Sequence, residues 1–176
     1  MQYVRQSLGP DEELIAVGHF HWMYSLLAVL NIVWGIVGCI GVLYAAIYFQ
    51  AHYGSGVHAQ GVIGAVRELH PAIRLMAFFA FIMGVMRFAQ MMVYKVSTEI
   101  AITNARLIYK RGLVARYVGE MSIDRIEGVN VLQSFWGRLL GYGRVMVRGM
   151  GIGEVILPPL ADPIDFRKAI ERARTS

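Results

Sequence analysis

Charge is scarce in this sequence, and cysteine is almost absent. Charged residues make up 16% of the 176 residues and hydrophobic residues 56%, whereas an ordinary soluble domain has about 25% charged residues. The one cysteine, Cys39, lies inside an apolar run and has no partner for an intrachain disulfide. It therefore indicates a packing role and not a reactive thiol.

Catalytic and metal-binding motifs are also missing. The sequence contains no H-E-x-x-H, G-x-S-x-G, phosphate-binding P-loop or paired-cysteine spacing. The glycine-rich segment 149–153 lies between two expected strands, so it predicts a hairpin turn and not a phosphate cradle. The five histidines show no metal-ligand spacing. We therefore expect no enzymatic activity, no metal and no other cofactor.

Two long apolar runs account for the missing charge. Residues 22–49 contain no charged side chain, and residues 75–94 contain one, Arg87. About 20 apolar residues suffice to cross a bilayer as a helix, so the runs predict a transmembrane hairpin over 22–94. A signal peptide does not fit the first run, which is too long, begins too late and follows an acidic segment. A buried helix of a soluble protein is the alternative for the second run.

The outer loop of this hairpin is expected near residues 50–74. A short helix at 59–69 fits there, limited by Pro71. Residues 1–94 hold four Lys or Arg and four acids, whereas residues 95–176 hold thirteen against eight. The positive-inside rule therefore places the C-terminal part and the N-terminal segment 1–21 in the cytoplasm.

After the second run the hydrophobic period changes to two. Glu99, Ala101 and Thr103 alternate with Ile100 and Ile102, which is typical of a strand. Further strands are expected at 106–111, 113–123, 126–133, 144–148 and 154–157, with a possible helical turn in the connection 134–143. The last element is a helix with Asp162 as N-cap, Pro163 at its first position and an apolar face made by Phe166, Ala169, Ile170 and Ala173. The class is therefore α+β, with a small barrel closed by a helix.

Several segments resemble the bacterial pleckstrin-homology (PH) domain found in small membrane proteins. They are residues 103–112 (TNARLIYKRG), 123–131 (IDRIEGVNV), Gln133-Ser134 and 137–143 (GRLLGYG). Pro10, Glu12 or Glu13 and residues 19–22 ahead of the first run also fit. The resemblance implies a PH-like barrel of about seven strands over 95–176, capped by a C-terminal helix, and a location in the bacterial inner membrane. It implies no settled biochemical activity.

The turn at Gly112 is surrounded by basic side chains. If the turn faces the bilayer, these side chains are candidates for contact with anionic lipid headgroups, and the alternative is a solvated basic face. The candidates are Arg106, Lys110, Arg111 and Arg116.

The connection at 134–143 is unusually apolar. Its large side chains either plug the barrel or bind a protein partner, a second copy or the membrane interface. The partner-binding candidates are Phe135, Trp136, Leu139 and Tyr142.

Two polar residues interrupt the apolar runs at similar depth. Arg87 lies eight residues before Lys95, and Asn31 lies at about the same depth in the first run. We expect them to face each other, and the alternative is that Arg87 reaches the headgroups by itself. Gly35, Gly38 and Gly41 recur every three residues, which favours close packing against the second helix.

The function that fits these features is a non-enzymatic, membrane-anchored adaptor. Its PH-like domain would engage a protein partner or a second copy, with contact to anionic membrane lipids. A lipid-headgroup sensor and an accessory subunit of a larger membrane complex are the alternatives. Nucleic acid is not expected as a partner, because the sequence has no recognition helix, zinc spacing or basic-aromatic strand pattern.

Overall fold

The computed structural model describes residues 2–54, 61–112, 117–151 and 153–175. The chain divides into two compact units. One is Ser25–Met92, and the other combines Met1–Tyr24 with Val93–Ser176. The N-terminal segment therefore belongs to the same unit as the C-terminal part, and the first turn of one long helix and the end of the other lie in that unit.

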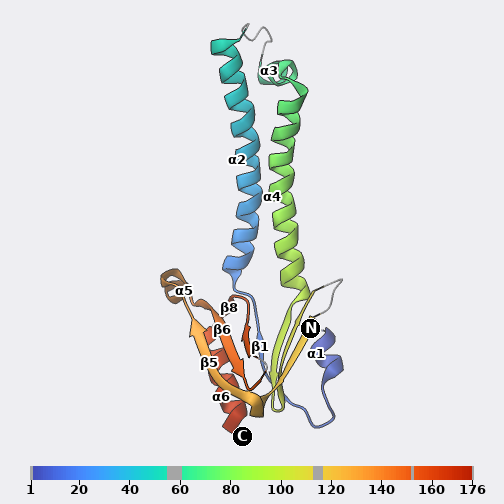
Figure 1. Ribbon diagram of the computed structural model, residues 1–176, viewed down its shortest axis with the longest axis vertical. Coiled ribbons are helices and arrows are strands. Elements are labelled where there is room, and N and C mark those ends of the chain that lie inside the picture. The colour runs from blue at the N-terminus through green and yellow to red at the C-terminus, as the bar shows by residue number, and fades with distance from the viewer. Residues whose placement is uncertain (1, 55–60, 113–116, 152, 176) are drawn as a thin grey trace. The chain divides into compact units, whose positions relative to one another are not determined.

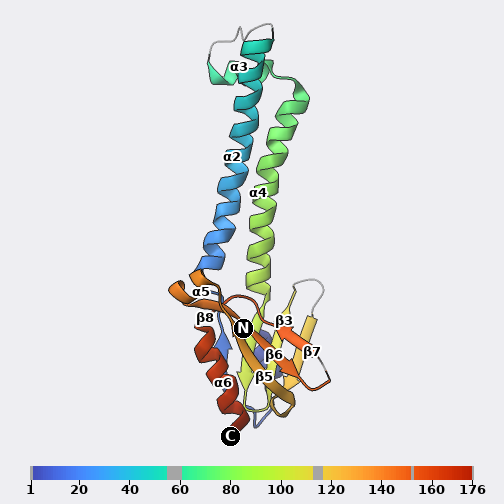
Figure 2. The same cartoon turned by 60° about the vertical axis from the view of Figure 1, so that its left-hand side comes forward.

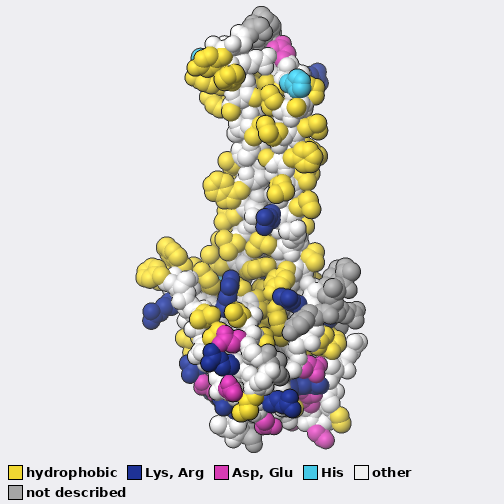
Figure 3. Space-filling view, in the orientation of Figure 1, with side chains coloured by type: hydrophobic (Ala, Val, Ile, Leu, Met, Phe, Trp, Pro, Cys, Tyr) yellow, Lys and Arg dark blue, Asp and Glu magenta, His cyan; other side chains and the backbone are white. Residues whose placement is uncertain are grey.

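The unit Ser25–Met92 is a helical hairpin. It consists of α2 (Trp22–Tyr53) from its second turn on, α3 (Val62–Glu68) and most of α4 (Pro71–Ser97). Both long helices are long and apolar enough to cross a membrane, and they expose apolar side chains along much of their length (Figure 3). The expected short helix is confirmed. Pro71 ends no helix but begins α4, as its missing N–H allows at a first helical position.

Small residues let the two long helices approach closely, side by side (Figures 1 and 2). A Cβ atom added to Gly84 would lie 2.6 Å from the carbonyl oxygen of Asn31 and 2.8 Å from Cα of Gly35. Gly38 faces Ala80, whereas a Cβ atom at Gly41 would meet nothing within 4 Å. Of the three predicted packing glycines, Gly35 and Gly38 therefore lie against the second helix and Gly41 does not.

The other unit contains two antiparallel sheets. The first has the order β1 (Leu14–Gly18), β2 (Glu99–Thr103), β3 (Arg106–Arg111) and β4 (Tyr117–Ser122). The second has the order β5 (Ile126–Leu132), β6 (Tyr142–Gly149) and β7 (Gly153–Ile156), and β8 (Leu160–Ala161) also pairs with β6. The remaining elements are α1 (Gln2–Ser7), the 3-10 turn η1 (Ile123–Arg125), α5 (Phe135–Leu140) and α6 (Pro163–Thr175).

The strands correct the sequence expectation in three ways. Among the described strands, no backbone ladder joins the first sheet to the second, so the closed barrel is not confirmed. The sheet includes β1, which precedes the long helices and was not predicted. The strand expected over 113–123 ends at Ser122 and continues as η1, and residues 113–116 lie outside the described part of the chain.

One hydrophobic core fills the space between the sheets and α6. Ile100 and Leu107 of the first sheet and Val145 and Val147 of the second belong to the same buried cluster. Helix α6 begins at Pro163, as predicted, and buries Phe166, Ile170 and Ala173 in this cluster. It contacts strands of both sheets and runs alongside them in Figure 2. Helix α6 therefore closes the open side of two sheets that do not close on each other.

Candidate functional site

Aromatic rings gather where the long helices join the sheets. Phe20 lies 5.0 Å from Tyr24 and 5.9 Å from Tyr94, measured between ring centroids. Tyr24 is in the first turn of α2, and Tyr94 is in the last turn of α4. The Tyr94 hydroxyl lies 3.2 Å from the hydroxyl of Tyr109 in β3. Phe20, Tyr24, Tyr94 and Tyr109 therefore form one connected aromatic group within the unit that holds the sheets.

A pocket of about 300 Å³ opens beside these tyrosines. Its polar lining comes from three tyrosines and two arginines, and its apolar lining from the segment after β7. The lining residues are Tyr24, Tyr94, Tyr109, Arg111, Arg144, Ile156, Leu157, Pro158 and Pro159. No acidic side chain is among them. We call this the tyrosine–arginine pocket.

The Tyr109 hydroxyl is held in its neutral form. Burial and then the hydrogen bond with Tyr94 raise the pKa of Tyr109 to about 12, although a hydrogen bond and the charge of Arg111 act in the opposite direction. Because the ordinary value is 10.0, the hydroxyl stays protonated throughout the physiological range. The pocket therefore carries the two positive charges of its arginines and the neutral hydroxyl of Tyr109.

The four predicted lipid-binding residues do not form one exposed cluster. Arg106 donates to Glu12 and to Glu120, and Lys110 lies 3.7 Å from Glu99 and over the ring of Tyr3. Arg111 lines the tyrosine–arginine pocket, and Arg116 lies outside the described residues. Arg106 and Lys110 therefore have carboxylate partners within the fold.

Sequence reasoning did not indicate that Arg144 lines the same pocket as Arg111. Arg144 lies in β6 between the buried residues Gly143 and Val145, so alternation alone marks it as a solvent-facing residue. Its place beside a residue of β3 depends on how the two sheets pack. No local pattern in the sequence reports that packing.

Three of the four predicted partner-binding residues lie exposed on α5. Phe135, Trp136 and Leu139 are 77%, 61% and 66% exposed, and the rings of the first two meet edge to face. They do not plug the core. Tyr142 differs, since it is partly buried and its ring lies 5.3 Å from that of His21. We call Phe135, Trp136 and Leu139 the α5 face.

Local capping explains why this short connection is helical. The Ser134 hydroxyl accepts a hydrogen bond from the backbone N–H of Gly137, as an N-cap does. Gly141 ends the helix with φ 77°, a conformation that glycine adopts without strain. The α5 face is thus presented by a helix with both ends satisfied.

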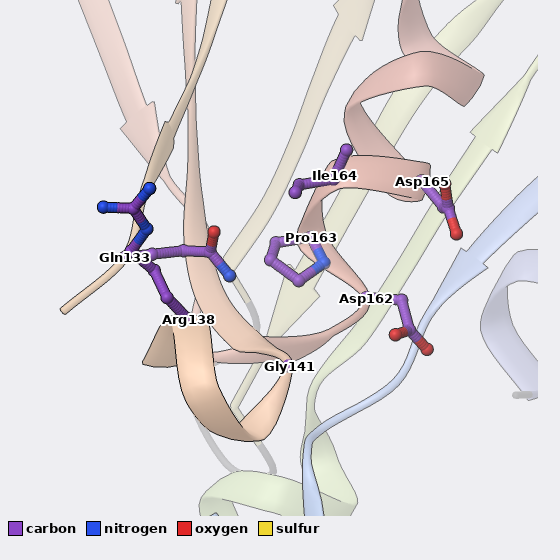
Figure 4. Close-up of a pocket in the computed structure, with 7 residues that line it drawn as sticks. All are labelled: Gln133, Arg138, Gly141, Asp162, Pro163, Ile164 and Asp165. Carbon is purple, nitrogen blue, oxygen red and sulfur yellow. The ribbon is translucent and has the colours of Figure 1, made fainter. Parts of the chain in front are cut away.

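A second pocket, of about 360 Å³, lies at the start of α6 (Figure 4). Figure 4 shows the guanidinium of Arg138 on one side of Pro163 and the carboxylates of Asp162 and Asp165 on the other. Asp165 is paired with Lys168, at 3.1 Å. Because its charged groups do not converge, this pocket offers no evident binding chemistry.

The intramembrane candidates lie in the helical hairpin. The side-chain amide of Asn31 donates to the Leu27 carbonyl at 2.7 Å and to the Met91 sulfur at 3.4 Å. Met91 is one helical turn from Arg87. Arg87 is exposed and shows no hydrogen bond to another described residue. The pairing of Asn31 with Arg87 stays a prediction.

Residues 13–174 match the bacterial PH domain family. The chain belongs to this family. No curated protein and no solved structure matches it. The PH match begins just before β1 and ends within α6, so it includes both long helices. PH domains are generally binding modules and not enzymes, which gives the chain a general binding or adaptor role.

Proposed function

We propose that this PH protein is a membrane-anchored adaptor. Helices α2 and α4 cross the bacterial inner membrane, and the PH domain engages a protein partner from the cytoplasmic side. The observation that carries the proposal is the α5 face, three large apolar side chains left exposed on a capped helix of a binding module. The protein itself performs no catalysis in this proposal.

The helical hairpin supports the membrane location. Many of its large apolar side chains are exposed, as those of Trp34, Tyr44 and Phe79 are. A soluble protein rarely exposes apolar surface of this extent. Thirteen of the seventeen Lys and Arg residues follow Tyr94, so both termini are assigned to the cytoplasm.

The composition of the α5 face supports a protein as its occupant. Aromatic side chains and arginine are the residues that most often dominate protein interfaces, and Arg138 lies exposed on the same helix as Phe135 and Trp136. The sensor alternative loses support at the Gly112 turn, since Arg106 and Lys110 are held by carboxylates.

Photo-crosslinking in intact cells tests the adaptor role. A photoreactive residue at Leu139 is expected to form a discrete adduct with a protein, and Trp136→Ser in the same chain should abolish it. The matched control places the same residue at Met150, which is 56% exposed but lies away from α5. Adducts with lipid alone, or the same protein adducts from both positions, would contradict a protein partner at the α5 face.

Cysteine labelling tests the orientation separately. Cys39 is replaced by Ala, and a single cysteine is placed at Gln2 or at Ser176. Neither site should react with an impermeant reagent added to intact cells, and both should react after the membrane is opened. Reaction from outside at either site would show that the assigned topology is wrong.

A further inference from the structure

A histidine caps the start of the first long helix. The carbonyl of His21 accepts a hydrogen bond from the backbone N–H of Tyr24 at 3.0 Å, and its ring nitrogen Nδ1 accepts one from the N–H of Met23 at 3.2 Å. These are the two bonds that an N-cap residue makes. The ring-to-backbone bond recurs at the start of α4, where Nδ1 of His70 accepts from the N–H of Ala72 at 3.3 Å.

Only the neutral imidazole can make this cap. A ring nitrogen that accepts a hydrogen bond carries no proton, whereas both nitrogens of the imidazolium carry one. Protonation of His21 therefore removes the bond from Met23. It also places a positive charge at the positive end of the helix dipole. Serine, threonine and asparagine, which are common N-caps, do not change in this way, whereas histidine changes its charge between about pH 5 and pH 8.

The surroundings of His21 do not favour its charged form. The residue is 8% exposed, and its ring lies 5.4 Å from the ring of Trp22 and 5.3 Å from that of Tyr142, measured between centroids. No carboxylate in the described part of the chain forms an ion pair with it. Contact with two aromatic rings offsets only part of the hydration that a buried imidazolium loses. His70, in contrast, is exposed, so water can replace its cap.

The other titratable or charged groups come from the elements beside His21. The set contains two arginines and one acid, so it does not favour a further positive charge. The groups are His19 and Tyr24 on its own segment, Tyr142 and Arg144 on β6, Arg138 on α5 and Asp162 after β8. The acid, Asp162, is exposed.

Backbone pairing explains why a residue before α2 touches one that follows α5. The N–H of Ala161 in β8 donates to the carbonyl of His19 at 2.9 Å, and β8 pairs with β6 at Tyr142. Tyr142 directly follows Gly141, the residue that ends α5. The ring of His21 therefore packs against the first side chain after α5.

We propose that His21 is a pH-sensitive contact that regulates the α5 face. At neutral pH its ring caps α2 and packs against Tyr142, which holds the end of α5. Protonation of His21 releases both contacts, and the resulting local opening of residues 134–143 weakens the binding of a partner at the α5 face. The last step rests on the proposed function, because it assumes a partner there. The loss of the cap does not.

Hydrogen exchange of the full-length protein in nanodiscs tests the contact. Exchange is compared at about pH 7.5 and about pH 5.5, within the histidine range, after correction for the intrinsic effect of pH on the exchange rate. The segments 20–25 and 134–143 should exchange about fivefold faster at the lower pH, as expected for loss of a cap. In His21→Asn the corrected rates should be equal at the two pH values, because asparagine can accept the same N–H and does not titrate.

The matched control is His19→Asn. It removes a titratable ring two residues away, and His19 is exposed. This variant should keep the pH dependence of the wild type. Equal pH dependence in His21→Asn and the wild type, or its loss in His19→Asn, would overturn the assignment to His21.

Nitrogen NMR of the imidazole gives a second check that needs no variant to fold. In the wild type at neutral pH, Nε2 of His21 should carry the proton and Nδ1 should not, as the bond from Met23 requires. A proton on Nδ1 at neutral pH would contradict the cap.

Photo-crosslinking at Leu139 separates the regulation from the proposed function. In cells whose cytoplasm is acidified with a permeant weak acid, the protein adduct should decrease in the otherwise wild-type chain and persist in His21→Asn. The same decrease in both chains, or no decrease in either, would overturn the regulation. Absence of an adduct at every pH would count against the proposed function, and the exchange rates would still decide whether His21 forms the pH-sensitive cap.

Discussion

Glu12 and Arg106, 94 residues apart, are joined by two parallel hydrogen bonds. Nε and Nη2 of Arg106 lie 2.9 and 2.8 Å from the two oxygens of the Glu12 carboxylate. The same carboxylate accepts from the Thr103 hydroxyl at 2.6 Å and from the backbone N–H of Gly9 at 2.9 Å. The pair ties the segment before the first long helix to the sheet that follows the second.

We predict that Glu12→Gln destabilises the PH domain by about 2 kcal/mol. The substitution keeps the size of the side chain but removes the charge that Arg106 faces, and a hydrogen bond to a charged group contributes about 1.5–3 kcal/mol. The Glu12 side chain is only 8% exposed, so water cannot replace the lost contact. The measurement is thermal unfolding of the full-length protein in mild detergent. Glu13→Gln, at an exposed neighbour, is the control and should change stability by less than about 0.5 kcal/mol.

Glu12 also predicts how stability depends on pH. Burial alone would raise its pKa, but hydrogen bonds from Arg106, Thr103 and Gly9 lower it from 4.5 to about 2. A carboxylate whose pKa is lower in the folded state stabilises the fold above its unfolded pKa and loses that contribution as the pH falls. We therefore expect stability to fall between about pH 4.5 and pH 2.

Thermal unfolding between pH 7 and pH 2.5 checks this dependence. In Glu12→Gln the decrease below pH 4.5 should be shallower than in the wild type. Some pH dependence should remain in the variant, because the pKa of Glu99 is lowered too. Burial raises that pKa, but the lowering effect of hydrogen bonds from the backbone N–H groups of Val4 and Tyr3, together with the charge of Lys110, is larger. Identical slopes in the wild type and the variant would show that Glu12 does not carry the effect.

The elements that could be predicted from the sequence are those with a local signal. Three features each follow from residues that are close together in the chain. They are the apolar runs, the alternation at 99–103 and the Asp-Pro start of α6. Strand β1 carries no such signal, because Leu14–Gly18 is short and only partly buried. It becomes a strand through pairing with β2, about 85 residues later in the chain, and no local pattern reports that partner.

For the candidate site, too, the sequence identified the type of each residue but not its distant contacts. The sequence identified the apolar character of α5 but not its exposure, which depends on which core positions other residues fill. It identified Arg106 and Lys110 as basic residues near a turn but not their partners Glu12 and Glu99, which reach them from other elements. It identified Arg111 as a basic residue next to Gly112, whereas Arg144 lines the same pocket as Arg111 only through the packing of two sheets.

The glycine contact between the long helices gives a third prediction. Gly35→Ala should destabilise the hairpin by about 1 kcal/mol or more. The new Cβ atom would lie 3.0 Å from Cα of Gly84, so the backbone of one helix would have to move away from the other. Gly41→Ala is the matched control in the same helix, since its Cβ atom meets nothing within 4 Å. It should be neutral or stabilising by about 0.5–1 kcal/mol, as alanine is in a helix interior. Equal melting temperatures of the two variants in detergent would contradict the contact.

The last prediction concerns Asn31 and Arg87. The amide nitrogen of Asn31 already donates to Leu27 and Met91, and its carbonyl oxygen accepts no hydrogen bond from another described residue. A guanidinium within an apolar span seeks an acceptor, because hydrocarbon offers none. Arg87 lies one turn from Met91 on α4, and we predict that it donates to this oxygen in the membrane.

A double-mutant cycle tests this pairing without relying on either variant alone. Asn31→Leu and Arg87→Leu, singly and combined, are compared by thermal unfolding in bilayer nanodiscs. Asn31→Leu alone should lower stability, since it also removes the bond to Met91. Coupling of about 0.5–1.5 kcal/mol between the substitutions is expected for a polar pair within a membrane. If the two effects add within error, Arg87 reaches the headgroups independently of Asn31 and the pairing is wrong.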